Sequence, residues 1–121
     1  MTTQVMTERQ RKVELSKAMS SYRTGVKQSA TALGNRHKEI GEKVLDQISD
    51  IRGRIDTLIS AGDYAPSVAY RIKQLQAQQR SQAEGFAAAI KQGELKAART
   101  VLRFLLSTDA ELSELCGIDV E

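Results

Sequence analysis

The sequence IGEKVLDQISDIRGRIDTLI, residues 40–59, decides which kind of fold this chain adopts. Apolar side chains recur in it at steps of four and three, namely Ile40, Val44, Ile48, Ile51, Ile55 and Leu58. This spacing places them on one face of an α-helix, which Leu45 and Ile59 widen. The intervening residues are mostly charged and prefer water. The stretch is therefore predicted to be an amphipathic helix that buries its apolar face against a partner.

The segments on both sides of this helix repeat the same helical spacing. The segment before it, residues 8–33, carries a narrower stripe of Leu15, Met19, Tyr22, Val26 and Leu33, with Ser29 and Ala30 at the missing step. The segment after it, residues 67–92, carries Val68, Ile72, Leu75, Phe86 and Ile90, with Gln79 and Gln82 in the middle of the stripe. We therefore predict three long helices, over residues 8–33, 36–61 and 67–92.

Glycines mark the expected ends of these helices. Gly34 and Asn35 tolerate the left-handed conformation of a helix end, so a break is expected there, although one long helix running through is the alternative. Gly62 and Asp63 end the second helix, and Pro66 is suited to the first turn of the next. Gly93 is either a cap or a kink.

The C-terminal segment is the most apolar part of the chain. From Glu94 onwards its apolar residues are Leu95, Ala98, Val101, Leu102, Leu105 and Leu106. Residues 108–111 read as a capping box, with Thr108 as the N-cap and Glu111 reaching back, so a last short helix is predicted up to Gly117. The predicted fold is all-α, with antiparallel helical hairpins forming a small bundle of three long helices and one or two short C-terminal ones. Residues 1–7 are predicted to be a flexible tail, and residues 8–121 a single domain.

The composition favours a soluble cytoplasmic protein. Cys116 is the only cysteine, so no intramolecular disulfide is possible, and a reducing compartment fits this. The first 14 residues are polar and do not resemble a signal peptide. No apolar run approaches the roughly 20 residues that cross a bilayer, so no membrane association is expected.

Basic and acidic residues alternate in blocks along the chain. Lysine and arginine prevail in residues 1–38 and 67–104, and acidic residues prevail in residues 39–66 and 105–121. One interpretation is that neighbouring antiparallel helices complement each other and so set their register. The alternative is that the first helix binds nucleic acid through its basic residues, which are Arg9, Arg11, Lys12, Lys17, Arg23 and Lys27.

No pattern in the chain indicates catalysis. His37 is the only histidine and is expected to be solvated beside Arg36 and Lys38. Cys116 lies in an acidic, leucine-rich segment and is expected to be a packed thiol. The carboxylates on the second helix lack the Glu-x-x-His spacing of metal sites in helical bundles. We predict that the protein is not an enzyme, with no catalytic or metal-binding residues and no cofactor.

Residues 54–72, RIDTLISAGDYAPSVAYRI, resemble the middle of ribbon-helix-helix antitoxins of the ParD type. In that family a helix ends in a small-Gly-x-Tyr turn, and the next helix begins near a serine that an arginine follows. The matching residues here are Gly62, Tyr64, Ser67 and Arg71. The resemblance implies a dimeric operator-binding protein that neutralises a toxin. The DNA-reading strand of the family would fall where this chain has the helix from Ile40.

The predicted function is that of a helical interaction protein, which is an adaptor, a small chaperone or an assembly factor. It would pack helix against helix with a protein partner or with itself, most simply as a homodimer. The tail holds more leucine than it needs for its own anchoring, and the predicted interface consists of Leu95, Leu102, Leu105, Leu106, Leu112 and Leu115. The alternative function is a nucleic-acid-associated regulator that uses the basic first helix.

Overall fold

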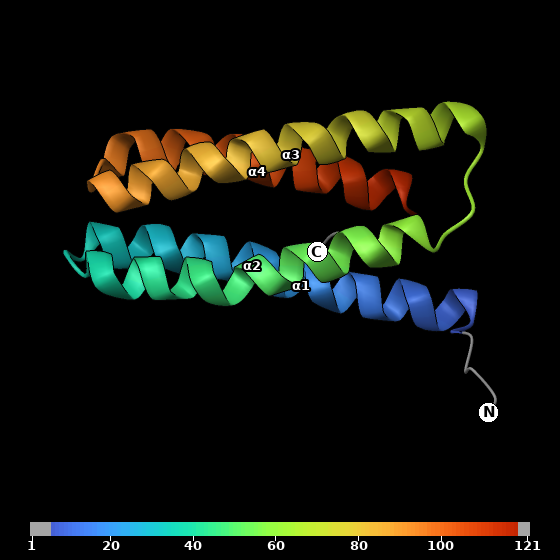
Figure 1. Cartoon of the computed structure of the whole chain (residues 1–121), viewed down its shortest axis with the longest axis horizontal. Helices are drawn as coiled ribbons and strands as arrows, with labels where there is room; N and C mark the ends of the chain where they lie inside the picture. Colours follow the sequence, from blue (N-terminus) through green and yellow to red (C-terminus); the bar gives the residue numbers. More distant parts are fainter. Residues whose placement is uncertain (1–5, 119–121) are drawn as a thin grey trace.

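A computed structural model describes residues 6–118, and these residues form four long α-helices. The helices are α1 (Glu8–Gly34), α2 (Lys38–Ser60), α3 (Pro66–Gln92) and α4 (Leu95–Leu115). Figure 1 shows α1 and α2 as one antiparallel hairpin and α3 and α4 as a second hairpin that stacks on the first. No strand occurs within residues 6–118. The all-α bundle of antiparallel hairpins is therefore confirmed.

The prediction of short C-terminal helices is wrong, because α4 continues unbroken to Leu115. Thr108, the expected N-cap, is buried, and its Oγ1 donates a hydrogen bond to Oε1 of Gln82 on α3 at 2.9 Å. The Asp109 carboxylate, also buried, pairs with Arg23 on α1 at 2.6 Å. Thr108 and Asp109, which belong to the predicted capping box, make contacts with other helices. They therefore do not end or begin a helix at this point.

The predicted boundaries of the first three helices agree with the structure to within two residues. α1 ends at Gly34, and the connection to α2 includes Arg36 in the left-handed region, with φ of 64°. Pro66 begins α3, and Gly93, with φ of 72°, is a left-handed cap and not a kink. At the other end Thr7, assigned to the flexible tail, caps α1 in a reciprocal arrangement with Gln10. The rest of that tail, residues 1–5, and the last residues of the predicted domain, 119–121, lie outside the described part.

The helices α1 and α2 approach each other closely because small residues lie where they cross. A Cβ atom added at Gly25 on α1 would lie 2.2 Å from Cγ2 of Ile48 on α2. One added at Gly41 on α2 would lie 3.0 Å from the carbonyl oxygen of Ser29, whose Oγ donates to the Gly41 carbonyl at 2.9 Å. These positions leave no space for larger side chains.

The residues of the predicted α1 stripe all lie in the core, whereas those of the predicted α2 stripe lie there only in part. Every member of the α1 stripe is buried, including Ser29 and Ala30 at the missing step. On α2, Ile48, Ile55, Leu58 and Ile59 are buried, whereas Val44 and Ile51 are only partly buried. Ile40 is 52% exposed, so its place in the core stripe is a wrong prediction. It lies in the first turn of α2, directly after the connection from α1.

Polar side chains lie where the two hairpins meet, mainly between α1 and α4. The Arg23–Asp109 pair crosses this contact, and Ser113 Oγ donates to Met19 Sδ at 3.3 Å. Gln79 of α3 is fully buried, and neither atom of its amide has a hydrogen-bond partner among the described residues. We call these residues, Arg23, Gln79, Asp109 and Ser113, the seam between the hairpins.

Candidate functional site

The six leucines predicted to form an interface all lie on α4, but they differ in burial. Leu105 and Leu112 belong to the core of the chain itself, with 1% and 0% exposure. The remaining four are partly buried against that core, namely Leu95, Leu102, Leu106 and Leu115. The chain therefore covers Leu105 and Leu112 without a partner, whereas homodimerisation stays a prediction.

Phe104 of α4 is a large apolar residue that is 58% exposed. Ala97 and Val101 precede it at steps of four and three and are partly buried against the core, so they border Phe104 on the same side of the helix. We call these residues the α4 strip. The strip continues into a shallow hollow of about 610 Å³ that includes Leu95, Ala97 and Val101 in its lining. Phe104 was not among the predicted interface residues, although its position, one residue out of register with Ala98, Leu105 and Leu112, indicates an outward direction.

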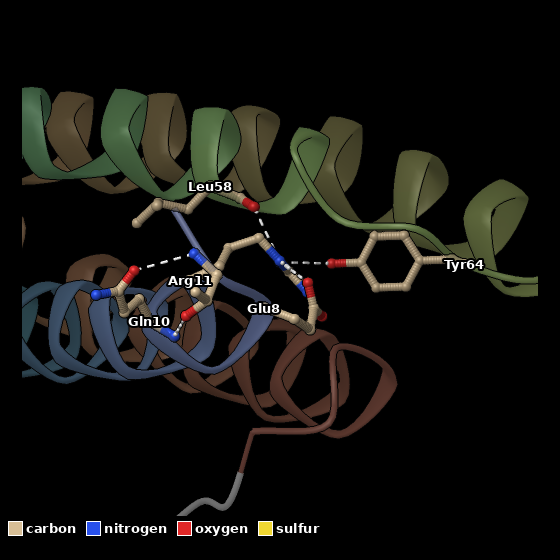
Figure 2. A network of polar contacts seen from close by, with 6 residues as sticks. Glu8, Gln10, Arg11, Leu58 and Tyr64 are labelled. Carbon is tan, nitrogen blue, oxygen red and sulfur yellow. Dashed lines mark hydrogen bonds and ion pairs between the residues drawn. The ribbon is translucent and has the colours of Figure 1, made fainter. Parts of the chain in front are cut away.

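Arg11, one of the predicted nucleic-acid contacts, is an internal residue with 3% exposure. Figure 2 shows its guanidinium between the ends of α1 and α2 and the following loop. Its Nη1 donates to the Leu58 carbonyl and to the Tyr64 hydroxyl, both at 3.0 Å. Nε and Nη2 donate to the Glu8 carboxylate at 2.9 and 2.6 Å, and this hydrogen bonding lowers the pKa of Glu8. Arg11 is therefore used within the fold, and its contact with nucleic acid stays a prediction that no observation supports.

Arg23 is also engaged within the fold. Its Nη1 lies 2.6 Å from Oδ2 of Asp109, a residue that is 1% exposed. Burial raises the pKa of the Asp109 carboxyl, and the charge and hydrogen bond of Arg23 oppose this only in part. Oδ1 of Asp109 has no partner among residues 6–118. Arg23 therefore pairs with the carboxylate, yet it is only partly buried and also lines the groove described next, so its contact with nucleic acid stays a prediction.

The other four predicted basic residues of α1, which are Arg9, Lys12, Lys17 and Lys27, are exposed. Lys12, Lys17 and Lys27 border a groove of about 900 Å³ on the outer side of α1, which we call the α1 groove. Hydroxyl groups line it between the lysines, contributed by Ser16, Ser20, Ser21 and Thr24. Such a combination of ammonium and hydroxyl donors suits the oxygens of an anion.

The groups with chemical reactivity are scattered. His37 is exposed beside the first turn of α2, as expected. Cys116 is 2% exposed, and burial raises the pKa of its thiol, so it is the packed thiol that was predicted. Within residues 6–118, no three residues among His, Cys, Asp and Glu are grouped as metal ligands would be. The described helices also include none that is long and apolar enough to span a membrane.

Comparison with known protein families, with curated proteins and with solved structures gave no match. The fold itself defines the class of the protein, which is a four-helix bundle of two antiparallel hairpins. The structure also places the residues that resemble ParD antitoxins. Tyr64 binds Arg11, and Arg71 pairs with Glu111 of α4 at 2.7 Å. The helix α2 occupies the place of the DNA-reading strand of that family, so the implied ribbon-helix-helix fold is not found.

Proposed function

We propose that this protein is a non-enzymatic helical interaction protein, an adaptor, a small chaperone or an assembly factor that works by helix–helix packing. The observation that carries the proposal is the α4 strip, in which Phe104 exposes 58% of its surface beside Ala97 and Val101. Apolar residues at steps of four and three form the contact face of one helix against another. A large aromatic side chain near the centre of such a face is typical of the anchor of an interface.

A second copy of this chain is the simplest partner for the strip. Two copies related by a two-fold axis would pair Phe104 with the hollow that continues the strip, because a two-fold interface uses the same surface on both subunits. The proposal thus keeps Leu95 from the predicted interface and adds Ala97, Val101 and Phe104. Leu105 and Leu112 serve the core of each subunit.

The mass of the protein in solution tests this proposal. Size-exclusion chromatography with light scattering at micromolar concentration is expected to give twice the mass of one chain. Phe104→Asp should reduce the mass to that of a single chain, because a carboxylate in the centre of an apolar contact is unfavourable. Tyr70→Asp is the matched control, because Tyr70 is a 65% exposed aromatic residue on α3 outside the strip. A single-chain mass for the wild type at every concentration would contradict self-association.

A nucleic-acid-associated role is the second candidate, and the α1 groove favours it. Three lysines and four hydroxyl groups would contact phosphates. Such contacts do not depend on the base sequence of the nucleic acid. Duplex DNA binding is expected to weaken steeply with salt. Replacing Lys12, Lys17 and Lys27 by Gln should lower the salt slope by about 3. The control replaces three other exposed lysines, Lys43, Lys73 and Lys91. If both triple variants bound DNA with equal affinity, the loss would reflect the change in net charge alone. That result would contradict a binding site in the α1 groove.

A further inference from the structure

A cleft of about 190 Å³ lies between α2 and α3 and is distinct from the α4 strip and the α1 groove. The buried side chains of Tyr22 and Val26 on α1 form part of its lining. The other apolar groups come from the two flanking helices and are Leu45, Ile48, Ala83, Phe86 and Ala87. The cleft therefore offers an apolar surface contributed by three helices.

Two arginines line this cleft at the same end. The hydrogen bond from Gln76 to Asp56, at 3.1 Å, shows the antiparallel register of α2 and α3. Arg52 lies one turn from Asp56 on α2, and Arg80 lies one turn from Gln76 on α3, so the register brings the two arginines opposite each other. Both line the cleft, and Glu84 is the acidic residue in the lining. The lining thus carries an excess of positive charge.

The guanidinium of Arg52 has an unused donor. Its Nη1 is buried and has no hydrogen-bond partner in the described part of the chain. In Arg11, by contrast, Nε, Nη1 and Nη2 all donate to acceptors. A buried guanidinium N–H without an acceptor is unfavourable. The Arg52 side chain as a whole is only partly buried, so turning this nitrogen toward an acceptor bound in the cleft would relieve that cost. Tyr22 also lines the cleft, and its phenol hydroxyl is a second hydrogen-bond donor.

We infer that this cleft binds a small amphipathic carboxylate. The carboxylate accepts hydrogen bonds from Arg52, because a guanidinium presents paired donors that match its two oxygens. The apolar part lies against Val26, Ile48 and Phe86. The volume limits this part to one aromatic ring or a short branched chain, since a cavity of about 150 Å³ holds a benzene ring. A peptide helix or a nucleic-acid strand is too large for the cleft.

The binding of 3-phenylpropionate to the full chain tests this inference, with 3-phenylpropanamide as its neutral counterpart. Titration followed by amide chemical shifts in two-dimensional NMR should show saturable binding, with a Kd on the order of 1 mM. The largest shifts should fall on residues 45–52 and 80–87. The amide is expected to bind about tenfold more weakly, because it loses the charge-assisted hydrogen bonds. No saturable binding, equal binding of the amide, or shifts confined to other helices would overturn the inference.

Two variants and one control separate a role in binding from a role in folding. Arg52→Met keeps the aliphatic stem, removes the charge, and should weaken binding of the carboxylate about tenfold. Arg103→Met, at an exposed arginine on α4, should keep the wild-type Kd. Ala83→Leu should block the cleft while Arg52 remains, and circular dichroism checks that each variant is folded. Wild-type affinity in Arg52→Met would overturn the inference. If that variant does not fold, Ala83→Leu decides, and unchanged affinity in it would overturn the inference equally.

Discussion

The contact inside the α1–α2 hairpin and the seam between the two hairpins are built from different kinds of groups. Inside the hairpin, glycines bring the backbones together, and a Cβ at Gly25 would lie 2.2 Å from Ile48. In the seam, Gln79 and Asp109 are buried with amide or carboxylate atoms that have no partner among residues 6–118. Close apolar packing is strongly favourable, whereas buried polar groups without partners are unfavourable. We therefore expect the hairpin to supply most of the stability and the seam to reduce it.

The largest expected effect tests the core of the hairpin. Ile55 is fully buried, so Ile55→Asp places an unpaired carboxylate in the core and should destabilise the fold by about 4 kcal/mol or more. This is comparable with the whole stability of a small domain, and the cooperative transition should be lost. Ile40→Asp is the control in the same helix, because Ile40 is 52% exposed and should change stability by less than about 0.5 kcal/mol. Thermal unfolding followed by circular dichroism measures both, and similar melting curves would show that α2 packs differently.

The next largest change in stability is expected where α1 and α2 approach each other closely. Gly25→Ala should destabilise by about 1–3 kcal/mol, because the new methyl group overlaps Ile48. Gly53→Ala is its control, because a Cβ at that position would meet no other part of the described chain within 4 Å beyond the neighbouring residues and backbone of its own helix. The control should stabilise by about 0.5–1 kcal/mol, since alanine favours a helix interior more than glycine does. Urea unfolding gives both values, and a gain of stability in both variants would mean that the helices are not in close contact at Gly25.

A smaller effect of opposite sign is expected in the seam. Gln79→Met keeps the length of the side chain and removes an amide that has no partner among the described residues. The free energy of unfolding should rise by about 1 kcal/mol. Gln78→Met, at an exposed neighbouring position, should change stability by less than about 0.5 kcal/mol. A loss of stability in Gln79→Met would show that the amide makes favourable polar contacts and that the seam is not a weak region.

The smallest effect is a pH dependence at Asp109. Burial raises the pKa of this carboxyl in the folded state above its ordinary value of 3.8, so the folded state binds the proton more tightly than the unfolded chain. The resulting stability is present below the ordinary pKa and is lost as pH rises through the folded-state pKa. Asp109→Asn lacks this titration. Relative to that variant, the wild type should lose stability as pH rises from about 3 to about 7, measured by urea unfolding. A difference that stays constant over this range would contradict a raised pKa.

The sequence predicted the helical class and most helix boundaries because both depend on neighbouring residues. The steps of four and three in residues 8–33 predicted an apolar stripe on α1, and every residue of that stripe is buried. Gly34, Pro66 and Gly93 mark backbone conformations that are local properties of glycine and proline. The helix start predicted at Thr108 was wrong. It was inferred from a local capping pattern, but Thr108 and Asp109 make contacts with α3 and α1.

The candidate sites were less predictable, because exposure depends on residues far along the chain. Arg11 and Lys12 are adjacent and equally basic, but one lies against Leu58 and Tyr64 and the other borders the α1 groove. Leu105 and Phe104 are adjacent and apolar, but only Leu105 faces the core. The cleft beside Arg52 has no local signature, since its lining comes from three helices.

The sequence by itself determined that this protein consists of amphipathic helices joined by short turns, because periodicity and turn residues act over a few positions. Only the tertiary structure decided that Thr108 lies inside a helix, that Arg11 is buried, that Arg23 pairs with Asp109, and that Gln79 is buried. The physical reason is that a polar group is exposed or buried according to which helices pack over it. That packing depends on the register and close approach of helices whose residues are distant in sequence.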